Sequence, residues 1–172
     1  MKTLEDQLAN YASYHRDRRN IATHFVGIPL IVLAIVVLLS RPTFEVAGLA
    51  LSPALVLTAL CLAYYLLLDR FLAALMAVLY GLSLWFGAWA AALPAADWLA
   101  IGLVGFGVGW VIQFIGHFWE GRKPAFFDDV VGLLIGPLFV VAEALFLLGL
   151  LADLRQAIEA RAGPVRSGPA RA

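Results

Sequence analysis

Charged residues are scarce in this chain of 172 residues. Only 14% of its residues are Asp, Glu, Lys or Arg, whereas 63% are hydrophobic. A soluble domain carries about 25% charged and about 45–50% apolar residues, so the composition argues against an ordinary soluble helical bundle. The formal net charge is zero, which removes any global electrostatic case for binding nucleic acid.

Cysteine is limited to Cys61, so no disulfide can form within the chain. Because Cys61 lies in an apolar run, the simplest interpretation is a small buried apolar residue. The first 24 residues lack the apolar core that a signal peptide needs after its basic start. Membrane insertion is therefore expected to depend on the first apolar run itself.

Five apolar runs are the candidates for membrane crossing, since about 20 mostly apolar residues span the hydrocarbon core as a helix. The first run is short and crosses only if residues 21–23 extend it. No strand-like alternation continues without interruption, so we predict an all-α, multi-pass membrane helical bundle with four or five transmembrane helices. The runs are Phe25–Leu39, Val46–Leu68, Phe71–Leu93, Trp98–Phe118 and Val130–Leu151.

The fifth run leaves two topologies open. Gly136-Pro137 interrupts it, and proline favours a kinked or re-entrant segment because it lacks a backbone donor. A complete crossing would instead place the arginines of the tail outside the cell. Glu143 lies within the run, where an ionisable group is costly and is a functional candidate. Pairing with Arg70, or a hydrogen bond between helices, is the alternative for Glu143.

The domain organisation predicted from these runs is simple. One membrane-embedded domain covers residues 1–154, and residues 155–172 form a tail that we expect to be disordered because of its "GPVRSGPARA" ending.

Lysine and arginine are distributed unevenly between the two faces that the runs define. If the first four runs cross, the amino-terminal segment, the Asp69-Arg70 turn and the segment after Phe118 share one face, and the opposite turns carry only Arg41. The positive-inside rule then places the richer face in the cytoplasm. The Ala-, Leu- and Gly-rich composition favours a bacterial inner membrane. The basic residues of the richer face are Lys2, Arg16, Arg18, Arg19, Arg70, Arg122 and Lys123.

All three histidines lie in two polar segments on that face, "YASYHRDRRNIATH" (11–24) and "QFIGHFWEGRKP" (113–124). A lone histidine more often caps a helix, but imidazole is also a common ligand of zinc, copper, iron and nickel. Because His15, His24 and His117 share a face, we predict that they bind one metal at the cytoplasmic membrane boundary. His15 and His24 are nine residues apart and would lie on opposite faces of a straight helix, so the chain must bend or break between them.

Other polar residues surround these histidines. Asn20 shares a helix face with His24 and is expected either to position a ligand or substrate or to act as a polar cap. Gln113, His117 and Glu120 follow the spacing i, i+4, i+7 and form one stripe. Glu120 is a candidate fourth ligand, a residue that orients His117, or a solvated carboxylate.

A pair of cations, Arg122 and Lys123, follows the second polar segment. The pair suits an anionic head group, either a substrate carboxylate or a lipid phosphate. The alternative is a plain anchor on the positive side of the membrane.

Three motifs resemble the Mpo1-like family over nearly the whole chain except the tail. They are "YxxYHxxxxNxxxHxxGxP" from Tyr11 to Pro29, "QFIGHxxEGRKPA" from Gln113 to Ala125, and "GPLFVVAE" from Gly136 to Glu143. The resemblance implies an Fe(II)-dependent dioxygenase that shortens 2-hydroxy fatty acids by one carbon. The expected catalytic residues are His15, His24, His117 and Asn20, and the expected substrate contacts are Arg122, Lys123, Gln113 and Tyr14.

The implied chemistry fits the predicted site. A 2-hydroxy acid chelates iron through its hydroxyl and carboxylate, and three histidines leave positions for this chelate and for dioxygen. The alternative is a non-catalytic metal- or lipid-binding membrane scaffold or transporter. Membrane lipid is an expected partner in both cases, and the sequence leaves self-association open.

Overall fold

The computed structural model describes residues 2–167, which form seven α-helices, one short 3-10 helix and a two-stranded hairpin. The chain divides into two compact units. The first comprises the chain up to Ile28 together with the chain from Trp110 onward, and the second comprises Pro29–Gly109. Both boundaries fall inside long helices, α2 (Arg18–Ser40) and α5 (Ala95–Glu120), so each of these helices continues from one unit into the other.

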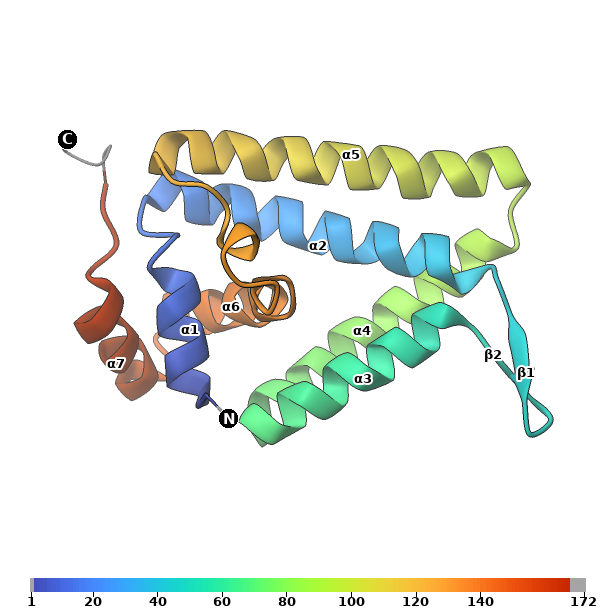
Figure 1. Ribbon diagram of the computed structural model, residues 1–172, viewed down its shortest axis with the longest axis horizontal. Coiled ribbons are helices and arrows are strands. Elements are labelled where there is room, and N and C mark those ends of the chain that lie inside the picture. Colours follow the sequence, from blue (N-terminus) through green and yellow to red (C-terminus); the bar gives the residue numbers. More distant parts are fainter. Residues whose placement is uncertain (1, 168–172) are drawn as a thin grey trace. The chain divides into compact units, whose positions relative to one another are not determined.

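The first unit contains every candidate site residue. It holds α1 (Leu4–Ala12), the ends of α2 and α5, the 3-10 helix η1 (Ala125–Phe127), α6 (Gly132–Leu147) and α7 (Ala152–Ala162). A capping box starts α1, in which the Thr3 side chain accepts from the Asp6 amide and the Asp6 carboxylate accepts from the Thr3 amide. Helix α1 packs against α6 and α7 (Figure 1).

The second unit is built from apolar helices. Helices α3 (Pro53–Leu68) and α4 (Arg70–Ala91) pack side by side (Figure 1). Asp69 separates them, because its extended backbone ends α3 while its carboxylate accepts from the Leu72 amide at the start of α4. In this unit α2 and α5 run antiparallel, since Gly105 lies against Ala34 and Gly102 against Leu38.

The predicted helical fold is confirmed for most of the described residues, but a short hairpin departs from it and shortens the second apolar run. Strands β1 (Phe44–Val46) and β2 (Leu49–Leu51) pair antiparallel. Ala47 and Gly48 between them both have positive φ, 52° and 79°, as a two-residue type I′ turn requires. The expected run Val46–Leu68 therefore contains the end of β1, the turn and β2. Only its last 16 residues, which follow Ser52, form a helix. Alanine at a positive-φ position gave no turn signal in the sequence.

Helix lengths and exposed side chains are consistent with a membrane protein. Among the described residues, α2, α4 and α5 are long and apolar enough to cross a membrane, and α6 with α7 qualifies as a fourth span only if this bent pair is one broken span. Large apolar side chains of the second unit face outward, including Leu67, Val78 and Trp85. Apolar surface on this scale marks a site of membrane or protein contact.

The fifth apolar run is broken, but at a different place from the one expected. Pro137 lies within α6, and the chain turns by 117° between α6 and α7, where Gly149 and Leu151 have positive φ. Residues 155–167, expected in a disordered tail, also differ from the prediction. They include most of α7 and a segment that contacts the amino-terminal loop, whereas residues 168–172 of that tail lie outside the described part.

Candidate metal site

A break between two helices brings His15 to His24. Helix α1 ends at Ala12 and α2 begins at Arg18, so His15 lies in the connecting loop while His24 lies two turns into α2. The centroids of the two imidazole rings are 4.4 Å apart. The expectation that the chain breaks between these histidines is confirmed.

His117 completes a cluster of three. From near the end of α5 its ring lies 4.9 Å from that of His15 and 5.1 Å from that of His24, between centroids. One ligand nitrogen from each residue lies within 4.8 Å of the other two. Nitrogens bound at about 2.1 Å to one ion are separated by about 3–3.6 Å, so small side-chain movements would bring the three onto a common ion.

Hydrogen bonding leaves lone pairs of the imidazoles available. Nδ1 of His15 lies 2.7 Å from the Tyr11 carbonyl and Nδ1 of His24 lies 2.9 Å from the Asn20 carbonyl. A carbonyl only accepts, so each Nδ1 carries the proton and each Nε2 keeps a lone pair. His15 Nε2 and His117 Nδ1 are buried without a hydrogen-bond partner. A carbonyl that orients an imidazole in this way is the usual second contact of a metal ligand.

Burial also favours the neutral, ligating form of His15. The side chain is fully buried, and it stacks on Tyr11 with 4.2 Å between ring centroids. Burial lowers the pKa of His15 well below its usual range, and the proximity of His24 and His117 lowers it further. The three buried imidazoles thus fit a metal that prefers nitrogen ligands.

The polar stripe of α5 faces the interior of the first unit. Gln113, His117 and Glu120 are buried, whereas Phe118, on the opposite face of α5, is 82% exposed. Gly116 permits the close approach of α2, because a Cβ there would overlap the side chains of Asn20 and Thr23 and lie 3.3 Å from the Asn20 Cα. At this end, α5 is therefore polar on its buried side and apolar on its exposed side.

Glu120 supports the loop that carries His15. Its Oε2 accepts from the Asp17 amide at 2.7 Å and from Asn20 Nδ2 at 3.1 Å. Asn20 Nδ2 also lies 3.3 Å from the Tyr14 carbonyl. Within the described residues, the group of potential ligands consists of the three histidines and does not include Glu120. The contacts therefore connect Glu120 with residues 17 and 20.

The four expected substrate contacts fall into two environments. Gln113 is buried, and neither polar atom of its amide has a hydrogen-bond partner. Arg122 donates to the Ser13 carbonyl at 2.6 Å and lies over the Tyr14 ring. The Tyr14 hydroxyl and Lys123 both donate to Asp128, at 2.9 Å and 2.5 Å. Of these four residues, Gln113 therefore has a buried polar side chain without a hydrogen-bond partner, whereas the other three are already paired.

Glu143 pairs with an arginine other than Arg70, the partner considered as one alternative in the sequence. Its Oε1 lies 3.5 Å from Nη2 of Arg16. Arg16 is itself buried, and its Nη1 donates to the Gly163 carbonyl at 3.0 Å. Sequence reasoning counted Arg16 only as a basic surface residue, because nothing in the local pattern marks a buried arginine.

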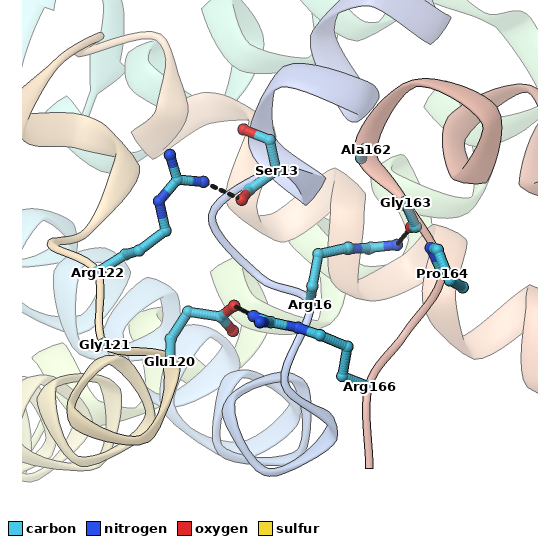
Figure 2. Close-up of a pocket in the computed structure, with 9 residues that line it drawn as sticks. All are labelled: Ser13, Arg16, Glu120, Gly121, Arg122, Ala162, Gly163, Pro164 and Arg166. Carbon is cyan, nitrogen blue, oxygen red and sulfur yellow. Dashed lines mark hydrogen bonds and ion pairs between the residues drawn. The ribbon is translucent and has the colours of Figure 1, made fainter. Parts of the chain in front are cut away.

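A cavity of about 420 Å³ lies beside these charges. Figure 2 shows Arg166 directed at Glu120, Arg16 at Gly163 and Arg122 at Ser13. Sequence reasoning missed Arg166 because it lies in the expected tail. The lining residues are Ser13, Arg16, Glu120, Gly121, Arg122, Ala162, Gly163, Pro164 and Arg166.

Comparison with known proteins gives two matches. A family model described as "2-hydroxy-palmitic acid dioxygenase Mpo1-like" matches residues 1–148. The chain is 30% identical over 161 residues to the 2-hydroxy-palmitic acid dioxygenase MPO1 of Saccharomyces cerevisiae, an alignment that covers 91% of this chain and 87% of the relative. No solved structure matches the chain.

Proposed function

Since the chain belongs to the 2-hydroxy-palmitic acid dioxygenase Mpo1-like family, we propose that it is a membrane dioxygenase that shortens long-chain 2-hydroxy fatty acids by one carbon. The observation that carries this proposal is the cluster of three buried histidines, whose ligand nitrogens lie within 4.8 Å of one another. The name of the yeast relative supports the substrate class. The acid in question has a polar head and a long apolar chain, which suits a polar site enclosed by apolar helices.

We propose that His15, His24 and His117 hold a ferrous ion. A ferrous ion bound there would supply the activation of dioxygen and the chelation of the hydroxyl and carboxylate oxygens of the acid. The overall reaction consumes one hydroxy acid and one dioxygen and yields the shortened acid, carbon dioxide and water. The acid supplies all four electrons, so this balance needs no further reductant.

The chain's own residues would position the reactants. Glu120 and Asn20 hold the loop of His15 through their hydrogen bonds to residues 14 and 17. Gln113 lies one helical turn from His117, and its unpartnered amide would bind a polar group of the substrate. Arg122 and Lys123 would attract the carboxylate toward the site from the membrane surface.

The proposed membrane topology follows from the histidines. His24 near the start of α2 and His117 near the end of α5 lie together, so the number of crossings between them must be even. Helices α2, α4 and α5 account for three, and we propose that the 16-residue α3 makes the fourth. Sixteen residues extend about 24 Å, and local thinning of the bilayer accommodates such a mismatch. The excess of lysine and arginine on the histidine side supports a cytoplasmic position for the site.

An activity measurement tests the proposal. The purified protein is loaded with Fe(II) and mixed in air with long-chain 2-hydroxy acids, and mass spectrometry and an oxygen electrode follow the reaction. We expect the acid one carbon shorter and one dioxygen consumed per acid, with the non-hydroxylated acid as an unreactive control. Iron that is bound without product over several chain lengths would contradict the substrate class. Bound metal or lipid without oxygen uptake would favour a non-catalytic scaffold or transporter.

The metal that copurifies with the protein is the second measurement. We expect elemental analysis to find iron. Zinc alone would favour a hydrolytic or structural site, because zinc has no redox chemistry.

A further inference from the structure

The position of the His15 side chain is set by a loop, whereas helices set the positions of the other two histidines. His24 and His117 project from helices, whereas His15 lies between α1 and α2. The loop must keep one path for the imidazole to meet the other two rings. The contacts that fix this path therefore decide whether the three nitrogens stay together.

The segment after α7 holds the loop through its backbone. The Arg166 amide donates to the Arg16 carbonyl at 2.7 Å, and the Arg18 amide donates to the Arg166 carbonyl at 2.9 Å. These two bonds form a parallel bridge between Asp17 and Arg166. The loop is thus paired with the carboxyl-terminal segment on both sides of Asp17.

The side chain of Arg166 holds the same loop by a second route. Its Nη2 donates to Glu120 Oε1 at 2.6 Å, as Figure 2 shows. The other oxygen of Glu120 accepts from the Asp17 amide and from Asn20. The Glu120 side chain has no exposed surface, and a buried carboxylate that loses its cation is strongly destabilised. Arg166 therefore holds the Glu120 carboxylate in place against the loop.

We propose that Arg166 is a positioning residue for the histidine site. It acts through Glu120 and through the backbone of residues 16–18, and it keeps His15 within reach of the ion that His24 and His117 bind. The inference rests on the proposed function for the identity of that ion, but not for the contacts. Arg166 lies outside residues 1–148, the part that the family model matches, so this clamp belongs to the carboxyl-terminal segment of this chain.

Substitution of two arginines in the full-length protein tests the clamp. Arg166→Met removes the ion pair with Glu120. Arg161→Met is the matched control, because Arg161 on α7 pairs with exposed Glu5 and Asp6 in the first turn of α1. Two readouts are measured in detergent: Co(II) affinity by calorimetry and amide hydrogen exchange at residues 17 and 18.

We expect Arg166→Met to weaken Co(II) binding about 10-fold or more, since loss of a residue that supports a ligand typically has this effect. Exchange at Asp17 and Arg18 should become faster. Arg161→Met should leave both readouts within about twofold of the wild type. Arg166→Lys keeps a cation facing Glu120 and should recover most of the affinity. If Arg166→Met does not fold, Arg166→Gln replaces it with the same expected direction.

A double-variant cycle tests whether Arg166 acts through Glu120. If it does, Glu120→Gln combined with Arg166→Met should bind Co(II) no more weakly than Glu120→Gln alone. The proposal would be overturned if Arg166→Met kept wild-type Co(II) affinity and exchange, or if Arg161→Met lost as much of both. It would also be overturned if the double variant lost affinity by the product of the two single losses. A wild-type protein that binds no Co(II) would contradict the proposed metal site, and exchange at residues 17 and 18 would still decide on the clamp.

Discussion

The rings of His15 and His117 lie 4.9 Å apart between centroids, although the whole of the second unit separates them in the chain. Both side chains are buried, with exposed fractions of 0% and 6%. Local sequence cannot impose such a contact, so the fold of the first unit must hold it. If the three histidines bind one ion, substitution of any one of them should weaken metal binding.

Replacing any one of the three histidines with alanine should weaken metal binding about 100-fold or more. Two imidazoles leave too few protein ligands to hold Fe(II) against water, and loss of a direct ligand should exceed the 10–100-fold effect of losing a supporting residue. Metal content after loading, and calorimetric titration, measure the effect. Asn10→Ala, on the exposed side of α1, is the control. Full occupancy in all three histidine variants would show that they are not ligands.

Asn20→Ala should lower activity about 10-fold while metal is retained. The substitution removes the bonds from Asn20 Nδ2 to Glu120 and to the Tyr14 carbonyl, and one such hydrogen bond typically contributes about 0.5–1.5 kcal/mol of stability. Glu120 Oε2 still accepts from the Asp17 amide, so the loop loosens without losing its main support. Asn20→Asp should be worse than Asn20→Ala, because it sets a second carboxylate against Glu120. Turnover and thermal unfolding of both variants check this order, and equal behaviour of the two would contradict the role of the amide.

The motif spacing predicted the grouping of the three histidines more completely than it predicted the contacts that support them. The nine-residue spacing of His15 and His24 required a break in the helix, and the structure has that break. The pairing of Glu143 with Arg16, and of Glu120 with Arg166, was not predictable, because such contacts depend on how distant segments pack. The turn at Ala47-Gly48 was missed for a local reason, since alanine rarely adopts positive φ.

Gly116→Ala should separate α5 from α2 within the first unit. The added Cβ would overlap Asn20 and Thr23 and crowd the Asn20 backbone at 3.3 Å, and overpacking of this kind typically costs about 1–3 kcal/mol. Gly107→Ala is the control on the same helix, because nothing lies within 4 Å of the position that its Cβ would take. There alanine should be neutral or stabilise the helix by up to about 1 kcal/mol.

Thermal unfolding and Co(II) affinity distinguish the two glycine variants. Gly116→Ala should lower both, since His117 follows Gly116 directly and moves with the helix. Gly107→Ala should leave the Co(II) affinity unchanged and should leave the unfolding temperature unchanged or slightly raised, because alanine favours a helix over glycine. Equal effects at the two positions would show that close approach of α2 to Gly116 does not set the histidine geometry.

The shared site also requires that His15 and His117 lie on one side of the membrane. Opposite sides would place them about 30 Å apart, far beyond a metal–ligand bond of about 2 Å. Single cysteines in a Cys61→Ala background test this by labelling with a reagent that does not cross the membrane. The exposed probe positions are Asn10, Arg70 and Lys123 for the histidine side and Glu45 in the hairpin for the other side.

We expect cysteines at positions 10, 70 and 123 to be labelled only from the cytoplasm, and the one at 45 only from outside. Position 70 follows α3 directly, so its label reports whether this 16-residue helix crosses. If 70 and 123 were labelled from outside while 10 was labelled from the cytoplasm, α3 would not cross and the count between the histidines would be odd. That outcome would rule out a common metal site, because no side chain spans the bilayer.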